Sequence, residues 1–415
     1  MASEHRLADA VSLGVLTSSV PRDVVDEAIV VTGRGARRSD GKLPPHVMVY
    51  FTMGLALFAD EDYEEVAARL AGTLDWWGCW DSAWEPPTSG GLTQARQRLG
   101  YEPLKAVFEQ VARPVAEPLT PGAFLGGWRL MAIDGFEWDV PDTAANAGAF
   151  GYAAGSEGRS AFPKVRVVSL SECGSHAMVA AEISGRAGTG EQALARRLYP
   201  RLEPDWLVIA DRNFYSFTDW QRAAATGAQL LWRVKRSRRL PVLGRFADGS
   251  FASILITPQA RPDRGRRYQR ILDAARAGRE LDPDEAMLVR VIEYEVPHDT
   301  PGAGAGDPIR LITTIVDPAQ ASAGQLAQAY HERWEHETGN GQIKTYLRGP
   351  GRVLRSKSPD LVRAEIYGYL LTHYAISALI CQAATEAGID PDRIKFTRTV
   401  RIVRRSLADP AAFPP

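Results

Sequence analysis

The sequence predicts an α/β protein in which a mixed-sheet core is interrupted by a β-rich insertion and flanked by helical regions. Apolar residues recur at helical spacing through about the first 120 residues and again after about residue 322. Between them, short β-like runs alternate with helices up to about residue 235. That order is typical of a sheet with helices on its faces. The 415 residues are enough for two or three structural units.

Residues 1–122 are expected to form an N-terminal helical domain. One helical pattern covers residues 45–70, and a second, over 92–116, follows a Pro/Gly-rich break and has Ser89 or Thr93 as a possible cap. Arginines are frequent in this region. Surface arginines on a helical bundle would explain them, and so would a helical domain that reads DNA. The basic positions are Arg34, Arg37, Arg38, Lys42, Arg96 and Arg98.

Residues 123–235 are expected to form the first part of the core. Three strands come first, followed by a helix, a strand, a helix and a strand. Ser216 is a suitable N-cap for the second helix, and Gly227 is a suitable stop. The expected strands are 128–134, 164–170, 176–183, 205–211 and 228–235, and the expected helices are 191–198 and 216–227.

Residues 236–318 are expected to form a basic, β-rich insertion in which the alternation of helices and strands does not continue. β-like runs cover 285–296 and 308–316. The stretch from 233 to 279 holds thirteen Arg or Lys and three Asp. Such a block is either a flexible, solvated surface or the contact surface for a polyanion. After the insertion, a core helix is expected within 319–350, starting near Ser322, and a C-terminal helical region over 351–415 includes a long helix at 359–388.

Two lone carboxylates are expected at the ends of apolar strands. Asp134 ends "LMAID" and Asp211 ends "LVIAD", and each precedes a turn. Open α/β sheets place functional groups at such positions, although Asp also occurs there as a turn former. With Glu337 on a later helix, three carboxylates can converge. Three carboxylates suit a pair of Mg²⁺ ions, because Mg²⁺ prefers oxygen ligands. Water and substrate phosphate oxygens complete its coordination shell.

Polar residues share one stripe of the helix that begins near Ser322. At about 100° per residue, Tyr330, Arg333, Glu337 and Lys344 fall within a stripe of roughly 60°. A solvated helix face would explain this pattern, as would a site that holds a metal ion and a phosphate backbone together.

Several other chemistries are excluded or disfavoured. His331 and His336 are spaced i and i+5, which does not fit the i and i+4 histidines of a zincin helix, and neither a GxxxxGK[ST] loop nor a GxSxG elbow occurs. Three distant cysteines (Cys79, Cys173 and Cys381) indicate neither a disulfide framework nor a zinc site. The N-terminus lacks a secretory pattern, and the apolar run 366–380 suits a buried helix rather than a membrane span. We therefore expect a cytoplasmic, nucleoid-associated protein.

The motifs resemble those of the DDE-type transposases of bacterial insertion sequences, in the insertion sequence four family. Its signature, Y-x2-R-x3-E-x6-K, matches Tyr330, Arg333, Glu337 and Lys344 at every spacing. "AIDG" and "ADRNFYS" resemble the two aspartate segments of the family, and "VLRSKSPDLVRAEIYGYLLTHYAI" resembles a C-terminal helix. Two departures stand out. "FEWDV" after Asp134 is bulkier and more acidic than usual, and two glycines near Lys344 weaken the helix.

The resemblance implies a ribonuclease H-like core with Asp134, Asp211 and Glu337 as the metal-binding and catalytic triad. The 126 positions between the last two are consistent with the insertion of this subgroup. The resemblance also implies a hairpin intermediate, which requires an aromatic platform for a flipped base; Trp232 and Trp334 are the candidates. The expected DNA contacts are Tyr330, Arg333, Trp334, Lys344, Arg212, Trp232 and Lys235.

The implied function is metal-dependent cleavage of double-stranded DNA at the ends of an element, followed by transfer of the 3′-OH ends into target DNA. Two Mg²⁺ ions, which Mn²⁺ can replace, are expected to assist attack by water and departure of the 3′ oxygen. A homodimer is expected on paired terminal inverted repeats. Two alternatives stay open at this point: a catalytically inactive DNA-binding descendant of such an enzyme, and a ribonuclease H-like nuclease without strand transfer.

Overall fold

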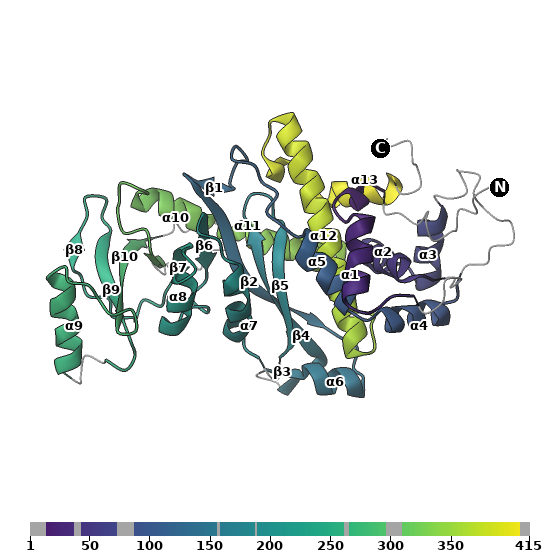
Figure 1. Cartoon of the computed structure of the whole chain (residues 1–415), viewed down its shortest axis with the longest axis horizontal. Coiled ribbons are helices and arrows are strands. Elements are labelled where there is room, and N and C mark those ends of the chain that lie inside the picture. The colour runs from purple at the N-terminus through teal and green to yellow at the C-terminus, as the bar shows by residue number, and fades with distance from the viewer. Residues whose placement is uncertain are drawn as a thin grey trace.

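The computed structural model describes residues 14–36, 43–72, 87–155, 158–186, 189–260, 265–295 and 309–406, apart from the side chains at 71, 334–337 and 406. The molecule is elongated (Figure 1). N-terminal helices pack around a long C-terminal helix at one end, a β-sheet crosses the middle, and a smaller group of strands with one helix forms the other end (Figure 1). Cys79, one of the three cysteines, lies outside the described residues.

A single mixed sheet forms the centre of the molecule. Its core strands lie in the order β5-β4-β2-β6-β7. β4 pairs antiparallel with β2 and with β5, whereas β6 runs parallel to β2 and to β7. This order and these directions are those of a ribonuclease H-like core, and the expected fold class is confirmed. The strands are β2 (Trp128–Asp139), β4 (Gly158–Glu172), β5 (Met178–Gly185), β6 (Trp206–Ala210) and β7 (Gln229–Arg233).

The central strand β6 is buried along its whole length because helices cover both faces of the sheet. Val208 and Ala210 pack with helices α7 (Glu191–Leu198) and α8 (Phe217–Ala224). Leu207 and Ile209 face the opposite side and pack with α10 (Ala323–His331). The expected cap of α8 is confirmed, since the Ser216 side chain accepts a hydrogen bond from the Asp219 amide. A strand apolar on both faces therefore separates two layers of helices.

The inserted strands extend the core sheet instead of forming a separate one. β11 pairs antiparallel with β7, and β10, β9 and β8 follow in order. One helix, α9 (Arg266–Arg276), packs on them through Ile271 and Leu272. The sequence did not predict α9, because the density of arginines obscured its few apolar residues. The strands are β8 (Gly244–Arg245), β9 (Phe251–Ile256), β10 (Ala286–Tyr294) and β11 (Ile309–Thr313).

Part of the basic block is structural. Arg290 is fully buried and forms an ion pair with Asp248. It also donates from Nη1 to the carbonyl of Ala321 at 2.6 Å and from Nε to Ser250 Oγ at 2.8 Å. Asp248 accepts in turn from the amide of Ala323, at 2.8 Å. This ion pair, of which only Arg290 is buried, joins the insertion to the start of α10.

The N-terminal helices pack around α12 (Pro359–Ala387), which is buried along most of its length. At the crossing with α2, a Cβ on Gly368 would lie 2.7 Å from the Thr52 carbonyl oxygen, so only glycine allows this close approach. Among the described residues, no helix is long and apolar enough to cross a membrane. The N-terminal helices are α1 (Arg22–Val31), α2 (Pro45–Leu57), α3 (Tyr63–Gly72), α4 (Ser89–Leu99) and α5 (Glu102–Val111).

Two details of the N-terminal prediction are corrected. The cap of α4 is Thr88, whose side chain accepts from the Gly91 amide at 3.2 Å, in place of Ser89 or Thr93. Arg96 does not point to solvent: it is buried, and its guanidinium contacts the Tyr63 hydroxyl and Ser356 Oγ. That arginine therefore ties the N-terminal helices to the segment before α12. Arg37, Arg38 and Lys42 lie outside the described residues.

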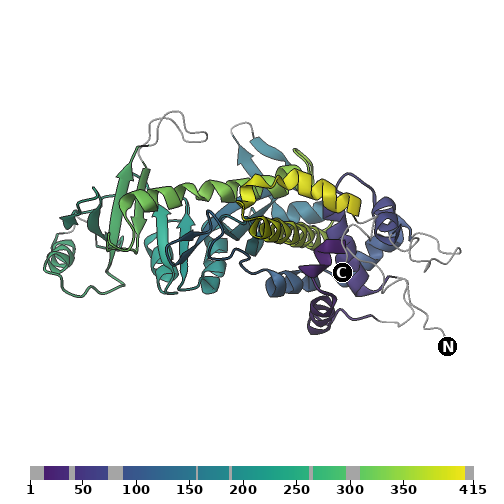
Figure 2. The ribbon, with the colours of Figure 1, turned by 90° about the horizontal axis from the view of Figure 1, so that it is seen from above.

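The helix after the insertion is segmented. Ser322 starts α10 with a capping box completed by Gln325, as the sequence led us to expect. A turn at Glu332 then separates α10 from α11 (Arg333–Gly341), and a π-helical segment, η5 (Gln342–Leu347), follows. The expectation of one regular stripe is therefore wrong, because the turn and the wider π-helical winding change the direction of the side chains. α13 (Phe396–Ser406) contacts η5 and lies nearly in line with α10 and α11 (Figure 2).

Candidate active site

The pairing of β2 with β6 brings the two predicted aspartates together. These parallel strands are in register up to Ile133 and Ala210, the last pair. Asp134 and Asp211 are the next residues on the two strands, so they lie side by side where β6 ends. The expected position of Asp211, directly after a strand, agrees with the structure. That of Asp134 does not, because β2 continues to Asp139 along β4.

The Asp134 carboxylate is about three-quarters buried and held in place by its neighbours. Its Oδ1 accepts from the Gly135 amide at 2.7 Å. Its Oδ2 lies 4.0 Å from Nη1 of Arg333, and the exposed fraction of the Asp134 side chain is 24%. Arg333, the first residue of α11, is buried. A buried cation therefore faces the first aspartate and offsets part of the repulsion between the two carboxylates.

Tyr330 lies behind this site, not on its surface. Its side chain is 3% exposed, and its hydroxyl oxygen is buried as well. Burial raises the pKa of the Tyr330 phenol to about 12, with the Arg333 guanidinium opposing and the Asp211 carboxylate adding to the increase. The Arg333 guanidinium carbon lies 5.8 Å from the ring centre. The prediction that Tyr330 contacts DNA phosphates is therefore wrong for this structure. Its ring instead lies against the buried Arg333 side chain.

Other residues of the signature are described only in part. Glu337 and Trp334 lie on α11, and their side chains are outside the described residues. α11 packs on β2, the strand that carries Asp134. Lys344 lies in the π-helical segment and is half-buried. Among the side chains that the structure describes, no group of three His, Cys, Asp or Glu residues gathers in a metal-binding arrangement.

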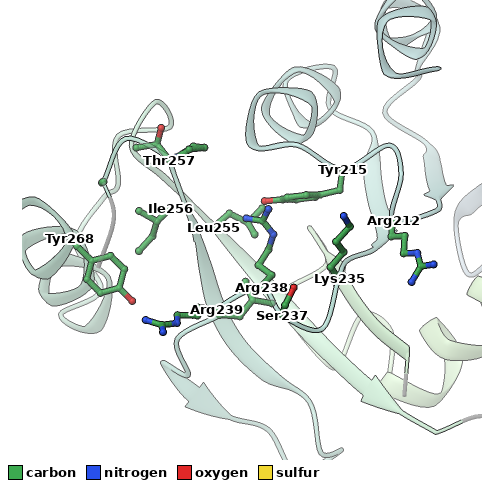
Figure 3. A pocket seen from close by; sticks show the side chains of 13 residues that line it. Arg212, Tyr215, Lys235, Ser237, Arg238, Arg239, Leu255, Ile256, Thr257 and Tyr268 are labelled. Carbon is green, nitrogen blue, oxygen red and sulfur yellow. The ribbon is translucent and has the colours of Figure 1, made fainter. Parts of the chain in front are cut away.

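A cationic cavity of about 470 Å³ opens between the Asp211 loop and the insertion. We call it the cationic groove (Figure 3). Arg212 follows Asp211 directly, and Lys235 lies just beyond β7; both are exposed, and both line it. Among the described residues that line it there is no carboxylate. The other charged or aromatic lining residues are Tyr215, Arg238, Arg239 and Tyr268.

The wall of the cationic groove combines charge with an aromatic ring. The Arg238 guanidinium carbon lies 4.3 Å from the centre of the Tyr215 ring, a stacked cation–π arrangement (Figure 3). Burial raises the pKa of Tyr215 to about 12, against the effect of Arg238. Sequence analysis noted the basic run but did not single out these residues. Their proximity depends on the pairing of β6 with β7, because Tyr215 follows β6 and Arg238 follows β7, and no local pattern shows that pairing.

Trp232, by contrast, belongs to the core. It has no exposed surface and packs against Trp220, with ring centres 5.4 Å apart and planes at 88°, and against Tyr199 at 6.2 Å. It lies on the face of the sheet covered by α7 and α8, opposite the face that holds Tyr330. The prediction that Trp232 serves as a platform for a flipped base is therefore wrong. Alternation along β7 directs this ring into the core.

The sheet order, the paired aspartates and the neighbouring cationic groove define a class of protein: nucleic-acid enzymes with a ribonuclease H-like core that act on phosphodiester bonds. Two family models match the chain. The one described as "Insertion element 4 transposase N-terminal" matches residues 10–109, and the one described as "Transposase DDE domain" matches residues 127–374. The second covers more than half of the chain, which therefore belongs to the DDE transposases of the insertion element 4 group.

Individual proteins show the same relationship. The chain is 27% identical to the Escherichia coli protein "Transposase InsG for insertion sequence element IS4" over 374 residues, which are 88% of this chain and 76% of that protein. It is 24% identical to the Escherichia coli "Putative transposase InsZ" over 215 residues, or 52% of this chain and 68% of that protein. A cryo-EM structure of piggyBac transposase in a synaptic complex with hairpin DNA has a TM-score of 0.48 and 11% identity, covering 95% of this chain and 79% of that one.

Enzymes of this family cleave and join DNA and use divalent metal ions. The two aspartates fit such ions. Carboxylate oxygens are hard donors, and the register of β2 and β6 sets Asp134 and Asp211 side by side at one edge. Arg333, 4.0 Å from one oxygen of Asp134, balances part of the negative charge of the two carboxylates. On the other side, Arg233 follows Trp232, the register partner of Ala210, so it lies beside Asp211. A divalent cation would bind through the carboxylate oxygens, with these two arginines flanking it.

Proposed function

We propose that this transposase cleaves DNA at the ends of its element and joins the freed 3′-OH ends to target DNA by a cut-and-paste route, with Asp134, Asp211 and Glu337 as its metal-binding carboxylates. The observation that carries the proposal is the β2–β6 register, which places the first two side by side. Glu337 completes the proposed set from α11, a helix that packs on β2.

Mg²⁺ is the proposed ion, with Mn²⁺ as a substitute, because the donor set consists of carboxylates. When bound, such ions activate the attacking water and stabilise the departing 3′ oxygen. Asp134 and Asp211 would hold them from two adjacent strands, a rigid support. Arg333 would orient Asp134 through its buried guanidinium and place positive charge beside the scissile phosphate.

The proposed DNA contacts lie on both sides of the aspartates. Lys344 would hold a phosphate beyond α11, and Trp334 would contact DNA from α11 itself. On the other side, the cationic groove would hold the sugar–phosphate backbone through Arg212, Lys235, Arg238 and Arg239, since it combines cations with no carboxylate among its described lining residues. This arrangement supports a bound strand that passes directly over Asp211, because Arg212 is the next residue in the chain.

The proposed organisation follows the predicted boundaries. Residues 1–122 would be the DNA-binding helical domain, 123–235 and 319–350 the two parts of the catalytic core, 236–318 the insertion, and 351–415 the C-terminal region. We further propose that two copies act together on paired ends, because two ends must be cut and joined in concert.

The test uses a DNA fragment that carries both element ends, taken from the sequences flanking the gene, and a supercoiled target plasmid. With Mg²⁺ or Mn²⁺ we expect excision of the fragment and its insertion into the plasmid, and with EDTA neither product. Supplying pre-cut ends separates joining from cleavage. Cleavage without joining of pre-cut ends would show a nuclease and overturn the proposal, as would full activity in EDTA. Light scattering of the end complex then counts chains; one chain on two ends would contradict the dimer.

A further inference from the structure

A row of four polar side chains, three of them buried, runs through the first residue of the π-helical segment. Gln342 lies between two buried histidines. Its Nε2 is 2.8 Å from Nδ1 of His176, and its Oε1 is 3.0 Å from Nε2 of His373. His176 Nε2 lies 3.3 Å from Oδ1 of Asp392. Four side chains from four separate parts of the sequence are thus joined in one row.

The row has a preferred direction. Nε2 of His176 makes no hydrogen bond to Asp392, but the negative charge of that carboxylate, 3.3 Å away, favours a proton on Nε2 of neutral His176. Nδ1 of His176 is then an acceptor, and the amide nitrogen of Gln342 donates to it. The amide oxygen of Gln342 in turn accepts from the Nε2 proton of His373. The amide orientation satisfies both rings at once, and a side chain without both an amide donor and an acceptor cannot do so.

His176 occupies its place at a conformational cost. It lies in the turn between β4 and β5 with φ of 60°, and among the described residues it is the one non-glycine residue with positive φ. Such a backbone is uncommon outside glycine and is kept where the surroundings enforce it. The turn is firmly anchored, because the Glu172 carboxylate just before it accepts from Ser175 Oγ and from the amides of Val115 and Ala116.

The other end of the row is equally fixed. His373 lies within α12, has no exposed surface, and packs its ring 5.4 Å from that of Phe396 at the start of α13. Gln342 therefore joins the π-helical segment to the β4–β5 turn on one side and to the two C-terminal helices on the other. His176, Gln342 and His373 have no role in the chemistry proposed above.

Gln342 lies close in the chain to two residues of the signature, so its contacts affect where their side chains point. It is five residues after Glu337 and two before Lys344. A π-helical turn holds an extra residue compared with an α-helical one, so a change from π to α winding would rotate the following residues by about 100°. Lys344 would then turn away from its present direction relative to α11. Packing of the buried Ile343 and Leu347 opposes such a slip, and the two directed hydrogen bonds of the Gln342 amide oppose it further.

We propose that Gln342 is a positioning residue: held between His176 and His373, it fixes the winding of the π-helical segment and so keeps Glu337 and Lys344 in place for the reaction on DNA. This inference rests on the proposed function. It assigns Gln342 no contact with metal or DNA.

The test compares Gln342→Met with Gln328→Met. Methionine keeps the length of glutamine and removes both hydrogen bonds; Gln328 is exposed on α10 and serves as the matched control. For Gln342→Met we expect a loss of about tenfold or more in the cleavage rate and a higher Mg²⁺ concentration for half-maximal rate, as for residues that orient ligands. Metal-free binding to end DNA should change less than about threefold, and Gln328→Met should match the wild type in all three measurements.

A second substitution keeps the inference testable if Gln342→Met folds poorly. His176→Asn tolerates the left-handed backbone but removes the ring. It should show the same loss of rate and the same shift in Mg²⁺ dependence, and the double variant should be no worse than either single one, since both break the same row. Unchanged rate and Mg²⁺ dependence in folded Gln342→Met or His176→Asn protein would overturn the inference. Absence of cleavage by the wild type would instead overturn the proposed function.

Discussion

Nη1 of Arg333 lies 4.0 Å from Oδ2 of Asp134, although the two residues are separated by almost 200 positions and lie on different elements, α11 and β2. This contact links the signature helix to the first strand of the core. It also means that an arginine expected to hold DNA already has a carboxylate neighbour in the DNA-free protein. In the DNA-free protein, Arg333 therefore helps to position the Asp134 carboxylate.

The paired aspartates are expected to be essential for cleavage and dispensable for DNA binding. Asp134→Asn and Asp211→Asn each remove a negative charge from the proposed metal site, and we expect cleavage to fall by more than about a hundredfold. Binding to end DNA, measured by fluorescence anisotropy without metal, should stay within about threefold of the wild type. Asp205→Asn, at the exposed opposite end of β6, is the control. Full cleavage in either active-site variant would refute the assignment.

Lys344 is expected to hold a phosphate. For Lys344→Ala, the slope of log K against log salt should decrease by about one unit, because one cation–phosphate contact is lost. The Mg²⁺ dependence of cleavage should not change, which separates this variant from those at Gln342. The measurement is end binding at four or more salt concentrations. An unchanged slope together with wild-type cleavage would mean that Lys344 is an ordinary solvated residue.

The cationic groove is expected to bind the DNA backbone. The double variant Arg238→Gln, Arg239→Gln removes two cations from its wall, so the salt slope should fall by about two units. Arg276→Gln with Arg279→Gln is the matched control, since these exposed residues lie at and just after the end of α9 and do not line the groove. Equal slopes for the two double variants would show that the groove has no special part in binding.

Trp232 is expected to stabilise the fold and not to contact DNA. Trp232→Ala removes a fully buried ring that packs against Trp220, so the free energy of unfolding should decrease by about 3–5 kcal/mol. Urea unfolding followed by fluorescence measures this change. DNA affinity, corrected for the folded fraction, should equal that of the wild type. A specific loss of affinity in fully folded protein would restore Trp232 as a base platform.

The stability of the fold is expected to decrease in mild acid because of His176. Burial lowers the pKa of His176 below its usual 6.5, although the carboxylates of Asp392 and Asp390 and the hydrogen bond with Gln342 oppose this. The unfolded chain then takes up the proton more readily, so the stability contributed by neutral His176 is lost as the pH drops below about 6.5. Unfolding curves at pH 7.5 and 5.5 measure it. A decrease of the same size in His176→Asn would assign the effect to other groups.

The sequence predicted those parts of the site that depend on local pattern. An apolar run ending in Asp marks Asp211, and a four-residue spacing marks the signature on the later helix. It did not predict that Asp134 lies inside a strand, because the length of β2 is set by its pairing with β4. Nor did it predict that Tyr330, Arg96 and Trp232 are buried. Polar and aromatic residues occur both in the core and on the surface, and only tertiary packing decides whether a given side chain is buried.

The inserted segment begins and ends on two paired strands, β7 and β11, and this pairing allows the segment to vary between such enzymes. β7 leads out of the core and β11 returns antiparallel beside it, with Leu311 opposite Arg233, so the two ends of the inserted segment are neighbours. Strands can therefore be added or lost at this side without moving Asp134 and Asp211, which sit on the inner strands. Grafting the segment between β7 and β11 from a relative, together with the Asp248–Arg290 anchor, should exchange the DNA-facing surface while the cutting chemistry is inherited intact.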